Sequence, residues 1–166
     1  AVAKAAKDAV AKDAAAKANA TKAATGLTAT TKANTDAANA VIIAKTATAK
    51  EQAAFTAADK GLITAKAATV NALNAFNTAD TTAKEAEANS KKIAGDANKK
   101  PEEKQAAAKV ATDKRNLANT AKTKLTQEQA KEKTAQTVAA VSATKLTQAQ
   151  AAQKTAETAL ATAKNN

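Results

Sequence analysis

Few side chains in this 166-residue sequence are suited to catalysis, because histidine and cysteine are both absent. Their absence removes the commonest acid–base group, metal ligand and thiol nucleophile. The carboxylates are scattered singly apart from Glu102-Glu103, and Glu128 and Glu132, which would share one helix face, stand among lysines. Three isolated glycines provide no phosphate-binding loop. We therefore predict a protein without enzymatic activity, cofactor or bound metal.

The net charge of +11 raises the question of a nucleic-acid or membrane partner. Lysine supplies phosphate contacts, but Arg115 is the only arginine, and two phenylalanines without tryptophan or tyrosine offer no set of rings for stacking on bases. The longest clearly hydrophobic patch, residues 40–44, is far shorter than the ~18 apolar residues of a membrane span. The sequence thus predicts neither a nucleic-acid partner nor a membrane span.

A heptad repeat sets where the remaining side chains point. A 21-residue unit, three heptads long, occurs twice between Lys124 and Lys164, and its register extends over the whole chain. Position d of the seven positions a–g lies three residues after position a and is mostly alanine. The pattern predicts long amphipathic helices that meet along positions a and d. Position a includes Ala6, Ala20, Leu27, Val41, Phe55, Leu62, Phe76, Leu125, Leu146 and Leu160.

The line of a and d residues is named here the alanine seam. Helices that meet across alanine approach to the short end of the usual interaxial range, about 8 Å. Each buried methyl stabilises weakly, at about 0.8 kcal/mol per CH2, so stability must come from many repeated contacts or from a partner chain. We expect a homo-oligomer that associates along this seam. The predicted packing residues are Ala58, Leu62, Ala65, Ala72, Phe76, Ala121, Leu125, Ala135, Leu146, Ala149 and Leu160.

The threonines gather on the opposite face of the predicted helices. Of 25 threonines, 20 fall at positions b, c or f, which point away from the seam, where random placement would put roughly 11. Threonine costs about half a kcal/mol per site relative to alanine, because its branched Cβ loses χ1 freedom in a helix. Helix stability alone therefore does not explain this face. The candidate binding face consists of Thr112, Thr123, Thr126, Thr134, Thr137, Thr144, Thr147, Thr155 and Thr158.

Three places in the sequence carry helix-stop signals. Gly26 and Gly61 are each followed by leucine, which is typical of a helix that ends in a left-handed glycine cap. The heptad does not slip across either glycine, which favours a continuous helix instead, and both alternatives remain open. The strongest break is 95–101, where Gly95 ends one helix and Pro101, followed by two glutamates, begins the next.

These signals predict an all-α fold in a single domain, residues 1–166. The expected helices span about 1–25, 27–60, 62–94 and 101–165. They would pack as an elongated antiparallel hairpin or as a bundle of about four helices, with a coiled-coil-like heptad seam. High alanine content, one proline and sustained periodicity argue against a disordered chain.

Threonines separated by 11 residues suggest a family resemblance. Thr112, Thr123 and Thr134 have this spacing, as do Thr144 and Thr155. The pattern resembles the alanine- and threonine-rich helical antifreeze proteins of cold-water fish, which carry threonine every 11 residues on a helix that is otherwise mostly alanine. The resemblance implies an ice-binding surface of threonine hydroxyls and methyls.

Two further resemblances cover less of the chain. Residues 129–136, Gln-Ala-Lys-Glu-Lys-Thr-Ala-Gln, resemble the 11-residue repeat of late-embryogenesis-abundant desiccation proteins. The in-phase heptad and the low-complexity composition resemble the alanine-seam coiled coils of silks and bacterial surface fibres. These likenesses imply a stress protectant and a structural fibre, respectively.

The functional hypotheses differ in which helix face they explain. Ice binding explains both faces, since alanine keeps the helices slim and a regular threonine array can order water. A self-assembling fibrous or surface protein explains only the seam, and a desiccation protectant is the further alternative. We therefore expect a non-enzymatic, extracellular protein whose partner is ice or ordered water.

The glycosylation triplet that begins at Asn19 is compatible with secretion.

Overall fold

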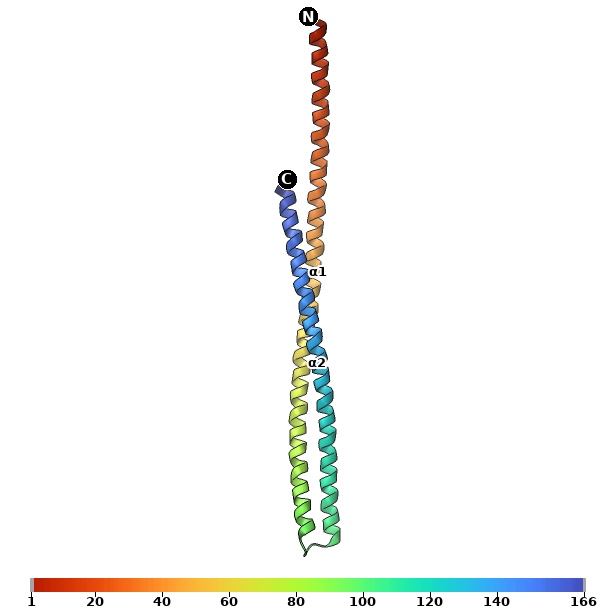
Figure 1. Cartoon of the computed structure of the whole chain (residues 1–166), viewed down its shortest axis with the longest axis vertical. Helices are drawn as coiled ribbons and strands as arrows, with labels where there is room; N and C mark the ends of the chain where they lie inside the picture. Colours follow the sequence, from red (N-terminus) through yellow and green to blue (C-terminus); the bar gives the residue numbers. More distant parts are fainter. Residues whose placement is uncertain (1, 166) are drawn as a thin grey trace. The chain divides into compact units, whose positions relative to one another are not determined.

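The chain forms two long α-helices that pack as a hairpin (Figure 1). This computed structural model describes residues 2–165. Helix α1 spans Val2–Gly95 and has 94 residues, and helix α2 spans Pro101–Asn165 and has 65. The predicted all-α class is confirmed, and of the two architectures left open by the sequence the hairpin is the one that forms.

The helix breaks considered at Gly26 and Gly61 are absent, because α1 continues through both residues. No glycine in the described part of the chain has a positive φ, so neither forms a left-handed cap. Glycine inside a helix costs only about 1 kcal/mol relative to alanine, whereas a turn would sacrifice several hydrogen bonds of a cooperative helix. The helices expected over 1–25, 27–60 and 62–94 are therefore a single helix, and that part of the prediction is wrong.

The connection between the helices lies where the sequence places its strongest break. Pro101 occupies the first position of α2, where its missing N–H costs no helical hydrogen bond. The Glu103 carboxylate accepts a hydrogen bond from the Lys100 backbone N–H at 3.0 Å. It also forms an ion pair with the Lys99 ammonium at 3.2 Å. The backbone bond, together with Lys99, lowers the pKa of Glu103. This return contact is half of a capping box, which fixes the start of α2.

The structure divides into two compact units, which are described separately. The first combines α1 up to Gln52 with α2 from Lys145 onward, and the second is Ala53–Thr144. In the second unit the alanine seam is the core: Ala83 and Ala118 have 0% and 1% of their surface exposed, and Ala72 has 5%. Every a and d residue from Phe55 to Ile93 is buried or half-buried.

The helices of the second unit run antiparallel, in a register that places large residues of one helix opposite small residues of the other. Arg115 of α2 forms ion pairs with both Asp80 and Glu87 of α1, each at 2.7 Å. An antiparallel pair in this register places position a of one helix opposite position d of the other. Leu62 then lies level with Ala135, Ala72 with Leu125, and Phe76 with Ala121. Each of these three bulky side chains thus lies opposite an alanine, which allows the two helices to approach closely.

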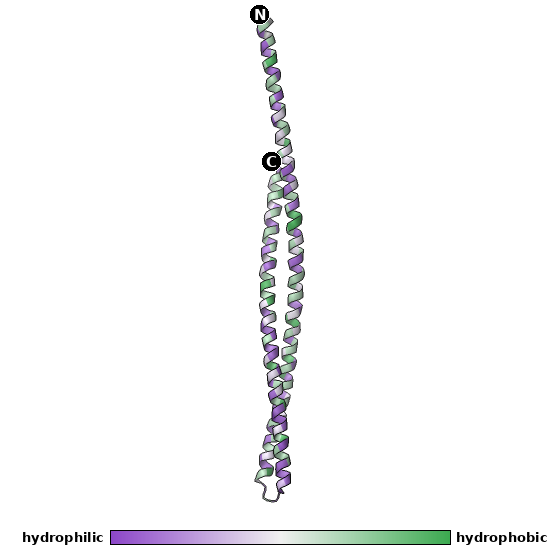
Figure 2. Cartoon of the chain, turned by 90° about the vertical axis from the view of Figure 1, so that its right-hand side faces the viewer, coloured by the Kyte–Doolittle hydropathy of each residue, from purple (hydrophilic) through white to green (hydrophobic). Residues whose placement is uncertain are grey.

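The first unit follows the same arrangement over part of α1. The Thr48 hydroxyl at position a contacts the Ala149 carbonyl oxygen at position d of α2, with an oxygen–oxygen distance of 3.2 Å. Lys45 and Glu157 form a cross-helix ion pair at 3.7 Å. By contrast, residues 6–29 of α1 are exposed, and the N-terminal part of α1 extends beyond the end of α2 (Figures 1 and 2). Only the last residue of this stretch, Ala29, lines a shallow hollow together with the α2 residues Ala159, Thr162 and Ala163.

Candidate functional site

The nine threonines of the predicted binding face all lie on α2 and are all exposed. All 20 threonines at positions b, c and f are exposed, whereas four of the other five are half-buried. In the second unit the face contains Thr112, Thr123, Thr126, Thr134, Thr137 and Thr144. In the first unit it contains Thr147, Thr155 and Thr158. The heptad register thus sorts threonine by exposure within each unit.

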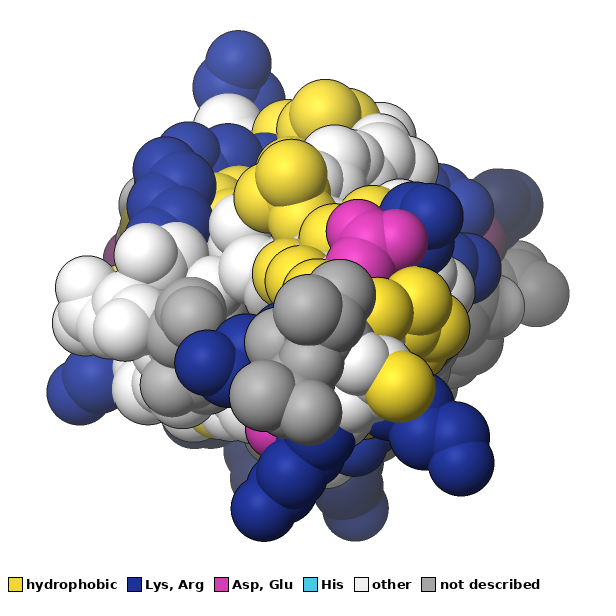
Figure 3. Space-filling view, turned by 90° about the horizontal axis from the view of Figure 1, so that it is seen from above, with side chains coloured by type: hydrophobic (Ala, Val, Ile, Leu, Met, Phe, Trp, Pro, Cys, Tyr) yellow, Lys and Arg dark blue, Asp and Glu magenta, His cyan; other side chains and the backbone are white. Residues whose placement is uncertain are grey.

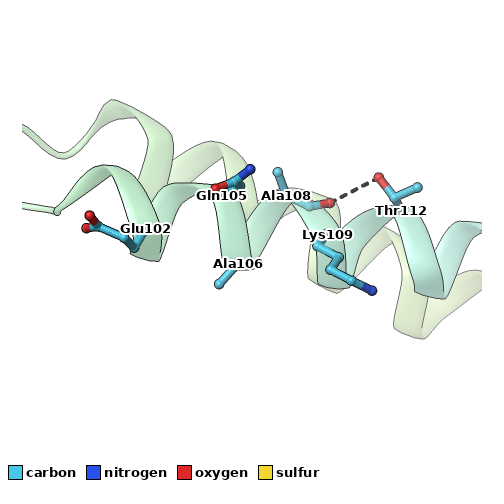
Figure 4. A pocket seen from close by; sticks show the side chains of 6 residues that line it. All are labelled: Glu102, Gln105, Ala106, Ala108, Lys109 and Thr112. Atoms are coloured by element: carbon cyan, nitrogen blue, oxygen red, sulfur yellow. Dashed lines mark hydrogen bonds between the residues drawn. The ribbon is translucent and has the colours of Figure 1, made fainter.

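A single hydrogen-bond pattern fixes these side chains. Eight threonines of the face donate their hydroxyls to the backbone carbonyl four residues earlier, with oxygen–oxygen distances of 2.9–3.2 Å: Thr112, Thr123, Thr126, Thr134, Thr137, Thr144, Thr155 and Thr158. Figure 4 shows one example, in which the Thr112 hydroxyl points back along α2 to the Ala108 carbonyl at 3.0 Å. Such back-bonding is a known option for threonine in a helix and selects its χ1 rotamer.

The hydrogen bond has a chemical consequence for the exposed face. A threonine hydroxyl has one donor proton and two acceptor lone pairs. Because the proton is committed to the backbone, the groups left for an outside partner are the methyl and the remaining acceptor capacity of Oγ1. The face therefore presents ordered methyls and oxygen acceptors, with little rotamer freedom to lose on binding.

Lysine interrupts the threonine face of α2 at position b, where Lys133 follows Thr126 and Lys154 follows Thr147 at the next b position. Their side chains are long and exposed, so they can bend away from a flat partner only at some cost in side-chain entropy. The face is consequently more continuous along positions c and f than along position b.

A second threonine column on α1 was not among the predicted site residues. Within the first unit, Thr21, Thr28 and Thr35 occupy successive b positions, and each bonds the carbonyl four residues earlier at 3.0 Å. Ile42 continues the column with 62% of its surface exposed. No charged residue occupies position b between Ala14 and Ala49. The seven-residue spacing of these threonines is the signal that could have identified the column, because the 11-residue spacing of α2 does not connect them.

The seam residues predicted for packing all lie between the two helices. Leu125 and Ala72 are buried, and the other nine are half-buried. Ala58 to Ala135 pack inside the second unit, and Leu146, Ala149 and Leu160 pack inside the first. One chain thus supplies both sides of the seam at these residues, which leaves them little surface for a second copy.

Arg115 forms an ion-pair cluster that sequence reasoning missed. Its guanidinium donates to both carboxylate oxygens of Glu87, at 2.7 and 2.9 Å, and to Asp80 at 2.7 Å. Hydrogen bonds from Lys84 and Arg115 lower the pKa of Asp80, and Arg115 lowers that of Glu87. The two carboxylates in turn raise the pKa of Arg115. The signal was present, since Asp80 and Glu87 lie one heptad apart at position e and Arg115 also occupies e.

Other surface features offer no converging chemistry. The shallow hollow at the start of α2 is lined by one helix only (Figure 4), and its Lys109 bonds Asp113 at 2.8 Å, which raises the lysine pKa. Among residues 2–165 no three His, Cys, Asp or Glu side chains form a metal-binding group. Lysine side chains point outward on several sides rather than gathering on one face (Figure 3).

Hydrophobic and hydrophilic residues are interspersed along both helices (Figure 2). Within the described residues, neither helix contains an apolar stretch long enough to cross a membrane. Comparison of the chain with protein-family models, with curated proteins and with solved structures found no match.

Proposed function

We propose that the protein binds ice through the outward threonines of α2. The observation that supports this most is the shared hydrogen bond from these hydroxyls to the carbonyl four residues earlier. A crystal surface is periodic and rigid, so a binding face gains most when its groups are already ordered before contact. Threonines that are all held in one orientation meet that requirement.

The chemistry of the exposed groups also suits ordered water. A methyl occupies space in a water lattice without competing for hydrogen bonds, and the adjacent Oγ1 accepts a hydrogen bond from a surface water. In the second unit, Thr112 to Thr144 extend over roughly 48 Å at a rise of 1.5 Å per residue. The many weak contacts along this length would add up to stable adsorption.

The threonine column of α1 extends the proposal to a second helix. Thr21, Thr28, Thr35 and Ile42 present methyl groups at every seventh residue without an intervening charge at position b. This column lacks the lysines that interrupt position b of α2. We therefore include it as a second ice-binding strip, one that the 11-residue spacing does not reveal.

A pair of lysine substitutions on α2 tests the proposal. Thr137 lies at the centre of the face at position f, and Thr137→Lys should remove most thermal hysteresis, because a bulky charge in the middle prevents flat contact along the strip. Gln129→Lys adds the same charge at exposed position e, outside the face, and should leave the activity nearly unchanged. Lysine is the better helix former, so circular dichroism should show unchanged helicity in both variants. Equal loss of activity in the two variants would count against the threonine face.

The alternative is a self-assembling fibrous or surface protein, favoured by the continuous heptad packing of α1 against α2 in each unit. Electron microscopy of the purified protein would distinguish the two hypotheses. Regular filaments at neutral pH would favour the structural role, and dispersed particles would favour ice binding.

The proposal assigns the protein no enzymatic activity, no cofactor and no nucleic-acid partner, and it places the protein outside the cell. The extracellular location rests on the glycosylation triplet that begins at Asn19, and the other assignments rest on the chemistry of the side chains. The chain lacks histidine and cysteine, and the carboxylates Asp80, Glu87 and Glu103 are engaged with cationic groups in the structure.

A further inference from the structure

Two polar residues, Thr69 of α1 and Glu128 of α2, interrupt the alanine seam of the second unit. Thr69 occupies position a, and the a residues one heptad away on either side are Leu62 and Phe76. Glu128 occupies position d, and the d residues one heptad away on either side are alanine. The register that places Leu62 level with Ala135 also places Thr69 level with Glu128. The two polar residues thus share one layer of the seam.

The Thr69 hydroxyl is used differently from the hydroxyls of the outward threonines. Its Oγ1 is buried and has no hydrogen-bond partner in the described part of the chain. By contrast, the outward Thr64 donates to the Lys60 carbonyl at 3.0 Å. At position a of the first unit, the Thr48 hydroxyl lies 3.2 Å from the Ala149 carbonyl oxygen across the seam. A buried hydroxyl without a partner is unfavourable, so native proteins almost always supply one.

The Glu128 carboxylate is the acceptor that lies level with this hydroxyl. Only 15% of the Glu128 side chain is exposed, and its Oε1 forms an ion pair with the Lys131 ammonium at 2.8 Å. A carboxylate offers about four lone-pair sites on two oxygens, so this ion pair leaves room for a second donor. Thr69 and Glu128 are both half-buried, which allows water to reach the edge of the layer.

We propose that Thr69 and Glu128 form a polar layer that selects the register of the hairpin, with one water molecule bridging the hydroxyl to the carboxylate. A slip of one heptad would place Glu128 level with Leu62 in one direction and with Phe76 in the other. Either slip would bury a charge against an apolar side chain that has no hydrogen-bond donor. The alanines at position d distinguish these registers poorly, because they recur every seven residues. A polar residue at a seam position is an established means of specifying register in coiled coils.

A double-mutant cycle tests the link between the two side chains. Thr69→Val removes the hydroxyl at constant shape, so it should raise the unfolding equilibrium constant several-fold when Glu128 is present. In a Glu128→Ala background the same change should leave that constant unchanged or lower it, because no acceptor remains. Thr64→Val is the matched control and should have the same effect in both backgrounds. Urea denaturation of the full chain measures all of these variants, and an equal effect of Thr69→Val in the two backgrounds would overturn the proposal.

A leucine at position 69 tests the apolar opposition that a slipped register would create. Thr69→Leu places a leucine level with Glu128, so it should destabilise the hairpin. Thr69→Leu combined with Glu128→Ala recreates the arrangement of Leu62 and Ala135. The stability gained from Glu128→Ala should therefore be much larger in the Thr69→Leu chain than in the unmodified chain. Equal gains in the two chains would contradict the polar layer.

Disulfide trapping reads the register itself, since the chain has no cysteine of its own. Ala79 lies level with Ala118 in the observed register, and it would lie level with Ala111 after a slip of one heptad. The unmodified layer should favour the disulfide of Ala79→Cys with Ala118→Cys, and Thr69→Leu should increase the yield from Ala79→Cys with Ala111→Cys. An unchanged yield of the slipped pair would show that the layer does not select the register. These measurements are made in liquid solution, so they are independent of any ice-binding activity.

Discussion

At the scale of single residues, the central feature is that the hydroxyl proton and the methyl of each outward threonine have different roles. The hydroxyl proton is bonded to the helix backbone, as in Thr144, which donates to the Ala140 carbonyl at 3.1 Å. The methyl and the oxygen lone pairs face outward. A helix surface chosen for stability would carry better helix formers at these sites, so the proposed function attributes the threonines to the groups that they display.

This difference in roles predicts an order of activities for substitutions at Thr144. Valine keeps the branched methyl and replaces only the hydroxyl, whose proton is already used, so Thr144→Val should retain most thermal hysteresis. Serine keeps the hydroxyl and loses the methyl, so Thr144→Ser should reduce the activity more. Ice-crystal growth measured at equal protein concentration and equal helicity would test this. The reverse order would show that the hydroxyl, rather than the methyl, makes the essential contact.

At the scale of helices, the opposition of large and small residues across the seam determines how closely α1 and α2 approach. Phe76 lies level with Ala121, so Ala121→Leu would place two large side chains at one level. We expect a loss of about 1–3 kcal/mol in the free energy of unfolding, as is typical of overpacking. Ala130→Leu is the control, because Ala130 is exposed at position f. Urea denaturation followed by circular dichroism would compare them, and equal stability of both variants would contradict the proposed register.

The ion pairs of Arg115 also belong to the helix scale, because they join α1 to α2. The folded-state pKa values of Asp80 and Glu87 lie below their ordinary values of 3.8 and 4.5. A lowered carboxyl pKa contributes stability that is present above the ordinary value and is lost as the pH falls through the folded value. The side chains are partly exposed, with 31% for Arg115 and 39% for Glu87, so solvent screening keeps the effect modest.

A variant of Arg115 separates this cluster from general acid effects. Arg115→Gln should lower the melting temperature at pH 7, where both carboxylates are charged, and should lower it less near pH 3, which is below their ordinary pKa values of 3.8 and 4.5. Thermal melts of the two proteins at both pH values make the comparison. A difference that stays constant between the two pH values would show that Arg115 stabilises the hairpin through packing rather than charge.

At the scale of the whole molecule, the sequence predicted those features that depend on periodic or strong local signals. The heptad assigned the seam and the exposed threonines, and the combination of Gly95, Pro101 and two glutamates located the connection. The Gly26 and Gly61 signals were misleading, because a local stop signal of about 1 kcal/mol competes with cooperative helical hydrogen bonds on both sides. For the Arg115 cluster, the shared position e of Asp80, Glu87 and Arg115 marked the possible partners, but pairing them required the antiparallel register as well.

The most direct test of the ice-binding proposal needs only the unmodified protein and a seed crystal. The crystal is held just below its melting point in a concentrated solution of the 166-residue chain, and its shape is followed during slow cooling. We expect a faceted crystal that does not grow until a lower temperature is reached, because adsorbed threonine faces would block the advancing ice surface. A crystal that grows at once as a featureless disc, at high protein concentration, would contradict the proposed function.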